Sequence, residues 1–499
     1  MRNFILLPLT LLIMSVQVWA DLPVLTLNPY APIEDSVIKV KNLVHSIKAE
    51  NKELTIHTTW WIDSSTIGGP LKSLKFLSIS RDSLSVQRIM INNIAANWCD
   101  EATSDGVVGS VDVPSSVGTI RQIDIDYRFS ADVTSADVVT ISSQDLLSIA
   151  KIIRSPDRGL AFDLRKKSGL DFSEQIRTTA RIEAPSSLIV FGSKAPKSKG
   201  KWQTIGPINA GRFVIGFADS IKNQLSQFSS SGTDFSVISK RDGSGLDVNL
   251  VKNIIKVGWP KYMNRFPRPS ASVSLIEDFS MPVGAGPAGT NVLAFSVQKL
   301  VPDKIQEFLE SNAGWPRFST AGEYINWLYG KSNNPMIDYW TTIVMHELGH
   351  LFFGFEWTSE RHPFLYDYWF SLGLGLLVDE QITMEMTGTI PSLYSNIIEY
   401  WQTRLAPMTT IDQRLVQPDV TQDQANGITS FNRLQHFGHA KALYVLREIR
   451  HQVGEASFDR LVTDYVRTGG TTAGYLGFRN KLLKLYPELP KLEAQLKIR

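Results

Sequence analysis

Two histidines and a glutamate in the middle of the chain have the residue types and the spacing that metal-dependent hydrolysis requires. The segment 342–354 reads TIVMHELGHLFFG and contains His346, Glu347 and His350. On a helix, residues four apart lie on one face, so both imidazoles can bind one ion while Glu347 lies close to a water on that ion. The alternative is a buried helix with two histidines at this spacing by chance, which is rare in a chain with 8 His. The pattern therefore predicts a zinc site with Glu347 as its general base.

Two histidines do not complete such a site, because a catalytic zinc usually has three protein ligands and one open position. Glu356 follows His350 by six residues, which is where metzincins have their third histidine. The glycine that bends the metzincin chain is replaced here by Phe353, and Gly354 comes one residue late. We therefore expect the third ligand further downstream. A second helix is predicted at about residues 366–386.

The HELGHLFFG run is similar to the H-E-L-x-H-x-x-F-G pattern of the membrane alanyl aminopeptidase family, which belongs to the gluzincin clan. In that clan a glutamate on the next helix completes the zinc site, and the resemblance leaves two frames open. In the first frame, the segment 369–373 stands for that family's W-x-x-E-G element, and Leu372 replaces the ligand. In the second frame, Glu380 is the ligand.

The second frame resembles the glycyl aminopeptidase family of gluzincins, which has a longer spacing and a P-F-x-Y-like segment between the two helices. Residues 363–366 stand in about that place. Because this frame needs no lost ligand, we take His346, His350 and Glu380 as the predicted zinc ligands. The alternative for Glu380 is an ordinary charged residue at the exposed edge of a helix. Its neighbour Asp379 could substitute for it or accept a hydrogen bond from a histidine N–H.

Three features depart from these families. Gln381 stands where a glycine usually follows the ligand. The glycine-rich segment 284–289 lies in about the region of the family's substrate-binding strand, yet it lacks the glutamate that anchors the α-amine of an aminopeptidase substrate. The segment 435–442 has no tyrosine to stabilise the oxyanion of the tetrahedral intermediate. His436 or His439 is the predicted donor, and the alternative is that both are ordinary histidines at the start of a helix.

The resemblance implies an α+β fold with an N-terminal antiparallel β domain, a thermolysin-like catalytic domain and a helical C-terminal part. In residues 21–195, runs of β-branched and aromatic residues with partial alternation predict an antiparallel sandwich or a curved sheet. His45 and His57 within it are predicted to be structural. The segment 192–207 is rich in Gly, Pro, Ser and Lys and lacks periodicity, so it predicts a domain boundary near residue 195.

Beyond that boundary the pattern changes to mixed helices and strands, and we predict a zinc peptidase domain at residues 196–390. Strands are expected at 212–217, 235–239, 271–276 and 292–297. Asp247 is predicted to cap a helix that ends by Pro260. Residues 391–499 are predicted to form a helical domain, because apolar residues from about residue 435 onward recur at helical spacing.

Residues 1–20 predict a secretory signal peptide, in which Arg2 precedes an apolar run and residues 18–20 form a small-x-small cleavage pattern. The alternative is an uncleaved anchor, but the apolar run is short for a bilayer span. No later apolar stretch is long enough to span a bilayer, so we expect no stable membrane insertion of the mature chain and a periplasmic or extracellular location. Cys99 is the only cysteine, which excludes an intrachain disulfide.

The overall charge of the chain is close to neutral and does not favour any class of charged partner. With 51 basic and 49 acidic residues the net charge is +2, which does not indicate a nucleic-acid partner. The leading hypothesis is a secreted or periplasmic metallopeptidase with zinc as cofactor and a peptide or protein as substrate. The first alternative is a gluzincin-like protein that has lost catalysis and acts as a binding module in the cell envelope. The second makes the β domain an adhesion or assembly module, which no sequence motif supports.

Overall fold

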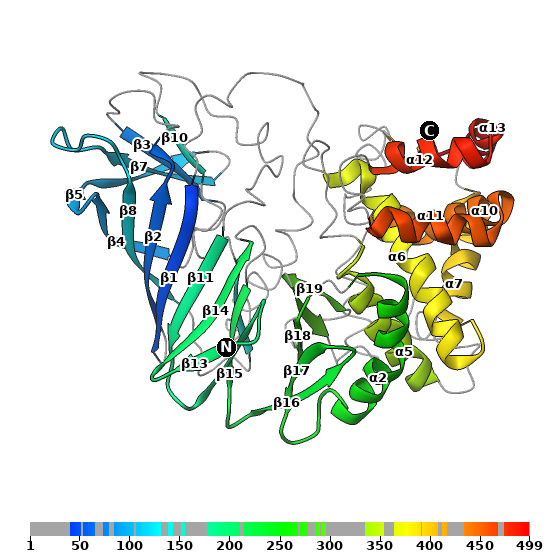
Figure 1. Cartoon of the computed structure of the whole chain (residues 1–499), viewed down its shortest axis with the longest axis horizontal. Helices are drawn as coiled ribbons and strands as arrows, with labels where there is room; N and C mark the ends of the chain where they lie inside the picture. Colours follow the sequence, from blue (N-terminus) through cyan, green and yellow to red (C-terminus); the bar gives the residue numbers. More distant parts are fainter. Residues whose placement is uncertain are drawn as a thin grey trace, which may run out of the picture.

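A computed structural model gives the architecture of most of the chain. It describes residues 40–50, 53–64, 73–78, 84–103, 106–130, 138–142, 151–154, 177–209, 214–267, 270–277, 285–289, 291–295, 335–353, 364–390, 392–407, 412–416, 434–467 and 474–498. The predicted signal peptide at residues 1–20 and the rejected metal ligand Glu356 lie outside these ranges. Figure 1 shows a β-rich N-terminal part and a helical C-terminal part, with a mixed sheet between them.

One large sheet organises the N-terminal part. Its strand order is β13-β14-β11-β1-β2-β8-β4-β5, and every neighbouring pair is antiparallel except β1 with β11. Alternate residues of β2, including Leu54, Ile56 and Trp60, are buried on one face, as expected for a sheet with one face in a core. The strands are β1 Val40–Glu50, β2 Glu53–Ile62, β4 Leu84–Ile91, β5 Ile94–Ala96, β8 Gln122–Ser130, β11 Arg177–Glu183, β13 Lys197–Lys199 and β14 Trp202–Asn209.

Two smaller sheets pack against the large one. Their strand orders are β10-β3-β7-β6 and β12-β15-β9. Val111 of β7 and Phe217 of β15 share a hydrophobic core with Ile56 and Ile125 of the large sheet, so the N-terminal part is a β-sandwich, as predicted. The strands are β3 Ser73–Ser78, β6 Trp98–Thr103, β7 Gly106–Asp112, β9 Val138–Ser142, β10 Lys151–Arg154, β12 Leu188–Gly192 and β15 Val214–Asp219.

The β-rich part extends past residue 195, where the sequence suggested a boundary. The segment rich in Gly, Pro, Ser and Lys forms the hairpin of β13 and β14 at one end of the large sheet, and β15 pairs with β9 and β12. Ile205 of β14 is fully buried. This segment is therefore a hairpin that packs on the sheet, and its polar residues are those on its exposed side. The N-terminal strands continue to Asp219.

A mixed sheet follows, in the order β16-β17-β18-β20-β19. Its central pairs, β17 with β18 and β18 with β20, are parallel, and the edge strands β16 and β19 are antiparallel to their neighbours. Ile238 and Ile276 of this sheet share a small core with Phe191 of the sandwich, so the two parts are in contact. The strands are β16 Asn223–Ser230, β17 Thr233–Lys240, β18 Ser272–Glu277, β19 Ala285–Gly289 and β20 Val292–Phe295.

Helix α2 (Val248–Arg265) connects β17 to β18 and corrects one prediction. Asp247 caps it as expected, since its carboxylate accepts hydrogen bonds from the backbone N–H groups of Asn249 and Leu250, both at 3.0 Å. The helix does not end at Pro260 but passes through it. Trp259 and Tyr262, on either side of the proline, are both fully buried, and their packing offsets the cost of a proline inside a helix.

The remaining described elements are helical and share one core with α2 and the mixed sheet. Helix α6 lies at the centre of this group, between α5 on one side and α10 and α12 on the other (Figure 1). Among the described residues, no helix has the length and hydrophobicity that crossing a bilayer requires. The helices are α5 Pro335–Gly349, α6 Phe364–Thr387, α7 Ser392–Tyr400, α10 Ala442–Val453, α11 Glu455–Arg467, α12 Gly474–Leu485 and α13 Leu489–Gln495, with π-helical turns η7 Trp401–Leu405 and η8 Leu434–Lys441.

His45 is part of a polar chain inside the sandwich. Its Nδ1 lies 2.7 Å from Thr58 Oγ1, which lies 3.2 Å from the hydroxyl of Tyr127. Burial lowers the pKa of His45 to about 3. His57 contrasts with it, because its ring is partly exposed and its Nδ1 lies 2.7 Å from Asp126 Oδ1. Neither histidine lies near the HELGH segment, in agreement with the structural roles expected of them.

The depressed pKa of His45 predicts a loss of stability in acid. In the unfolded chain a histidine has a pKa of about 6.5, so between pH 6.5 and pH 3 the unfolded state binds the extra proton. The free energy of unfolding therefore falls as the pH falls through this window, by about 2–3 kcal/mol between pH 7 and pH 4.5. Denaturant unfolding of His45→Gln should lack this part of the pH dependence, whereas His57→Gln should retain it. An unchanged pH dependence in His45→Gln would refute the assignment.

Candidate metal centre

The HELGH histidines lie at the end of α5 and in the turn that follows it. His346 and Glu347 belong to the last turn of the helix, and His350 comes directly after Gly349. The backbone N–H of His350 bonds the carbonyls of His346 and Glu347, both at 3.2 Å, so the helical path continues through the second histidine. Val344, Met345 and Leu348 are fully buried and anchor this turn in the core. The sequence spacing thus becomes a shared helical face, as predicted.

This face brings three potential ligand groups together. The ligand atoms of His346, Glu347 and His350 lie within 4.8 Å of one another, and the two imidazole centroids are 4.6 Å apart. Glu347 is 2% exposed, and its Oε2 lies 3.9 Å from His350 Nε2. Within the described part of the chain, no other set of three His, Cys, Asp or Glu residues has this geometry.

Asp379 of α6 orients the first histidine. Its Oδ2 lies 2.9 Å from His346 Nδ1, and its Oδ1 accepts a hydrogen bond from the hydroxyl of Tyr262 on α2. Burial raises the pKa of Asp379, while the hydrogen bonds from His346 and Tyr262 oppose that rise. The contact needs a glycine at position 349, because a Cβ there would lie 2.3 Å from Asp379 Oδ1. A carboxylate on Nδ1 keeps the proton on that nitrogen and leaves Nε2 as the metal-binding atom.

The second histidine is oriented by backbone. His350 Nδ1 lies 3.3 Å from the carbonyl oxygen of Phe353. Burial, followed by the nearby His346, lowers the pKa of His350 well below its usual range, so the ring is neutral at pH 7. A neutral imidazole that donates from Nδ1 presents the lone pair of Nε2. Two such rings, with a buried carboxylate beside them, fit a zinc ion.

Glu380, the favoured third ligand, is not brought to this cluster. Its Oε2 accepts a hydrogen bond of 2.8 Å from Nε of Arg447 on α10, and its Oε1 bonds the same guanidinium. Burial raises the pKa of Glu380, and the bonds to Arg447 oppose the rise. The neighbouring Gln381 accepts from Arg265, at 2.7 Å. In this arrangement Glu380 faces the C-terminal helices, which does not support it as a zinc ligand.

In the other sequence alignment, the one with the W-x-x-E-G element, Leu372 replaces the glutamate ligand. Leu372 precedes Asp379 by seven residues on α6, so after two helical turns it lies on the same face, toward α5. The two helices run antiparallel there, since Gly349 lies against Asp379 and Phe353 lies against Gly375. The Leu372 side chain is 1% exposed and has no atom that can bind zinc. Residues 369–387 of α6 therefore have no side chain in the group of three ligand residues, and Asp379 reaches that group through its hydrogen bond to His346.

The two histidines predicted as oxyanion donors have different outcomes. His439 of η8 lies beside the cluster, with its ring centroid 6.0 Å from that of His346. The side chain of His436 is outside the described residues. Lys441, two residues after His439, is buried and donates to the carbonyl of Lys497 at 2.8 Å, which anchors the end of η8.

Two orienting residues were missed by the sequence analysis. Tyr262 lies on α2 beyond Pro260, where that helix was expected to have ended. Arg447 lies on α10, and nothing in its local pattern indicates that it binds Glu380. Asp379 was considered as a hydrogen-bond acceptor for a histidine, and this is the contact that the structure shows.

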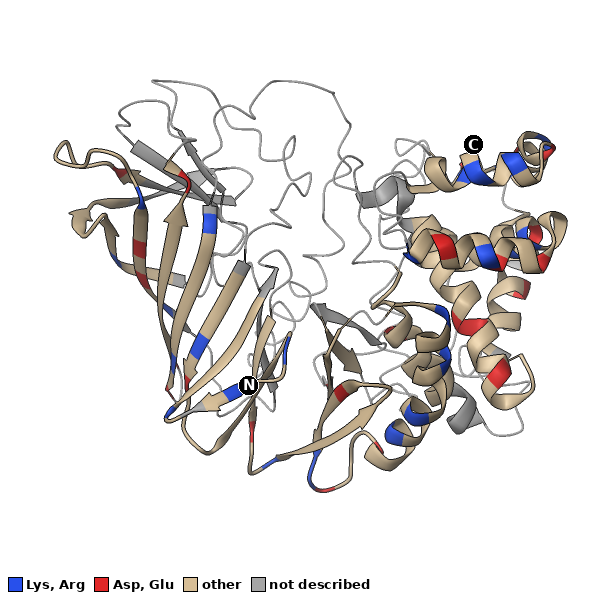
Figure 2. Cartoon of the chain, viewed as in Figure 1, with Lys and Arg blue, Asp and Glu red and all other residues tan. Residues whose placement is uncertain are grey.

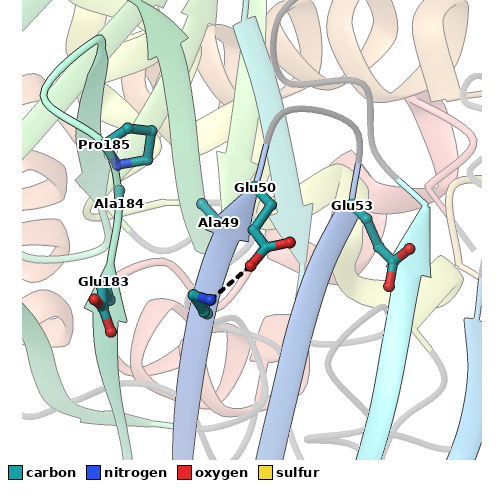
Figure 3. A pocket seen from close by; sticks show the side chains of 7 residues that line it. Ala49, Glu50, Glu53, Glu183, Ala184 and Pro185 are labelled. Atoms are coloured by element: carbon teal, nitrogen blue, oxygen red, sulfur yellow. Dashed lines mark ion pairs between the residues drawn. The ribbon is translucent and has the colours of Figure 1, made fainter.

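A surface hollow of about 770 Å³ occurs far from the cluster, at the ends of β1, β2 and β11. Figure 3 shows Glu50, Glu53 and Glu183 around it, with an ion pair of 2.6 Å between Lys48 and Glu50. Its charged side chains are exposed or partly exposed, and none of them belongs to the metal centre. The hollow therefore gives no reason to move the candidate site into the β-sandwich.

Comparison with solved structures identifies the fold. The chain is similar to an M1 zinc metallopeptidase from Deinococcus radiodurans, with a TM-score of 0.56, 12% identity, and coverage of 93% of this chain and 94% of that chain. It is also similar to native yeast LTA4 hydrolase, with a TM-score of 0.56, 15% identity, and coverage of 95% of this chain and 69% of that chain. No family model and no curated protein sequence matches the chain. The predicted α+β, gluzincin-like fold is confirmed.

The Glu380–Arg447 pair predicts how substitutions there will behave. Arg447→Met leaves a buried carboxylate without its cation and should lower the free energy of unfolding by about 2–4 kcal/mol. The double variant Glu380→Met with Arg447→Met should recover most of that loss, because two apolar side chains replace the ion pair. Arg460→Met, at an exposed arginine of α11, serves as the control. Urea unfolding measures stability, and zinc retention by the double variant checks that Glu380 is no ligand; loss of zinc there would contradict this arrangement.

Proposed function

We propose that this chain is a zinc-dependent peptidase whose centre is built on His346, His350 and Glu347. The observation that carries the proposal is a buried carboxylate beside two oriented imidazoles, on a fold shared with zinc metallopeptidases. Zinc, when bound, supplies a Lewis acid that polarises the scissile carbonyl and acidifies a water. The roles of the protein's own residues follow from where their atoms lie.

Glu347 has the position of a general base. Its side chain points into the space beside His350 Nε2, at 3.9 Å, and it is shielded from bulk solvent. A carboxylate in this place can take the proton of the attacking water and pass it to the leaving amine.

Asp379 and Tyr262 position the first histidine. The hydrogen bond from His346 to Asp379 and the one from Tyr262 to Asp379 join α2, α5 and α6 into one rigid unit. Because a metal ligand has to be held within a fraction of an ångström, this support is part of the catalytic arrangement. His350 needs no such carboxylate, since a backbone carbonyl orients it.

A peptide is the substrate class that the arrangement favours. One similar structure, a variant of the Deinococcus radiodurans enzyme, is bound to a Tyr-Ser-Ala substrate, with a TM-score of 0.53 and 12% identity. In this chain, β19 is an edge strand of the mixed sheet and lies close to α5. We infer that an extended peptide adds to this edge by backbone hydrogen bonds, which would place it over the end of α5. The β19 segment has no carboxylate to anchor an α-amine, so aminopeptidase specificity is not part of the proposal.

The second candidate is a gluzincin-like protein that binds without hydrolysis. The ion pair of Glu380 with Arg447 and the apolar Leu372 favour it, because α6 then contributes no zinc ligand. In the ribbon of Figure 2, the positions of basic and acidic residues alternate along both parts of the chain, so the charge pattern does not identify a partner.

Glu347→Gln separates the two candidates. As a zinc peptidase, the wild-type protein should cleave members of a peptide library, lose that activity in a chelator and recover it with zinc. Glu347→Gln should keep its zinc and lose about 10²- to 10⁴-fold in kcat, because the amide cannot accept the proton. Glu385→Gln, at a partly exposed carboxylate elsewhere on α6, is the matched control. Full activity in a zinc-loaded Glu347→Gln protein would refute the general-base role, and a wild-type protein without chelator-sensitive cleavage would favour the binding module.

A further inference from the structure

A third imidazole, from a separate segment of the chain, lies beside the two histidines of the candidate metal centre. His346 and His350 come from the end of α5, and His439 comes from the π-helical turn η8. The ring centroids of His346 and His350 are 4.6 Å apart, and those of His346 and His439 are 6.0 Å apart. His439 is not one of the three residues whose ligand atoms lie within 4.8 Å of one another, so its ring lies beside that group.

These separations are close to those of histidines on one zinc ion. Zinc binds imidazole nitrogen at about 2.0–2.1 Å in tetrahedral geometry, so the centroids of two such rings lie about 5 Å apart. The pair on α5 is slightly closer than this value, and His439 is about 1 Å further away. Zinc binding by all three rings would therefore require the His439 ring to move about 1 Å closer to His346.

The position of η8 explains why it can provide a ligand. Helix α10 continues directly from η8, and its first residue, Ala442, lies against Gly373 of α6, where an added Cβ would be 2.8 Å from the Ala442 Cβ. Helix α6 also contacts η8 itself, so both η8 and the start of α10 pack on the helix that carries Asp379. Phe437 packs edge-on against Trp401 at 5.8 Å and fixes the turn. π-helical turns occur frequently at functional sites, because they re-aim side chains.

We propose that His439 is the third zinc ligand, so that the centre has three histidines and Glu347 stands beside the open position. This inference rests on the proposed zinc-dependent function and adds the identity of the ligand that α6 does not supply. It replaces the expectation that His439 donates a hydrogen bond to the oxyanion. A site with three neutral histidines keeps the full +2 charge of zinc, which strengthens its effect on a bound carbonyl.

Zinc affinity of purified variants tests the inference directly. We expect His439→Gln, which keeps a similar size but removes the imidazole, to weaken zinc binding at least about 100-fold in competition with a chromophoric chelator. His439→Glu should restore much of the affinity, because a carboxylate can bind zinc. His451→Ala, at an exposed histidine of α10, and Glu380→Gln should bind zinc like the wild-type protein. Circular dichroism and thermal unfolding confirm that each variant is folded.

Cobalt substitution gives a second readout that does not depend on activity. The visible absorption of the Co²⁺ protein should change in His439→Gln and remain the same in His451→Ala. The inference is overturned if His439→Gln binds zinc normally and Glu380→Gln does not. It is also overturned if His439→Gln keeps its zinc and loses only kcat, since His439 would then be an oxyanion donor. Zinc binding by the wild-type protein decides the proposed function separately; a wild-type protein that binds no zinc overturns both.

Discussion

The hydrogen bond between His346 and Asp379 is the interaction on which the centre depends. It joins α5 to α6 inside the core, and Tyr262 extends it to α2 through the second oxygen of the same carboxylate. A glycine at position 349 is required for this close approach. Breaking the bond would leave a buried carboxylate with one partner and would release the ring that presents a metal-binding nitrogen. The bond therefore connects the stability of the helical core to the geometry of the site.

Two adjacent carboxylates of α6 make polar contacts with different helices. Asp379 faces α5 and orients the metal centre, whereas Glu380 faces α10 and holds Arg447. The first contact orients His346, and the second attaches the C-terminal helices to the same element. Because α10 continues from η8, the C-terminal helices also bring His439 beside the two histidines of α5. The C-terminal part therefore packs against α6 and lies next to the candidate centre.

Local sequence patterns predicted individual helices and strands correctly, apart from the end of α2. They did not predict which side chains contact one another between elements. The HELGH spacing fixes its own geometry on a helix, and the runs of β-branched residues predicted the sandwich. The choice between Asp379 and Glu380 could not be made from sequence, because adjacent residues point about 100° apart on a helix and only the rotation of α6 decides which one faces α5. Tyr262 was missed because the packing of aromatic side chains carries α2 through Pro260. The hairpin of β13 and β14 looked like a linker because its exposed residues are polar.

Anomalous diffraction at the zinc absorption edge, from crystals grown with one equivalent of zinc, tests whether His346 and His350 bind one zinc ion. We expect a single strong peak at about 2.0–2.1 Å from Nε2 of His346 and from Nε2 of His350, next to the Glu347 carboxylate. The nearest remaining protein atom would show which residue is the third ligand. Absence of a peak between the two histidines, in crystals that diffract well enough to show both rings, would contradict the account.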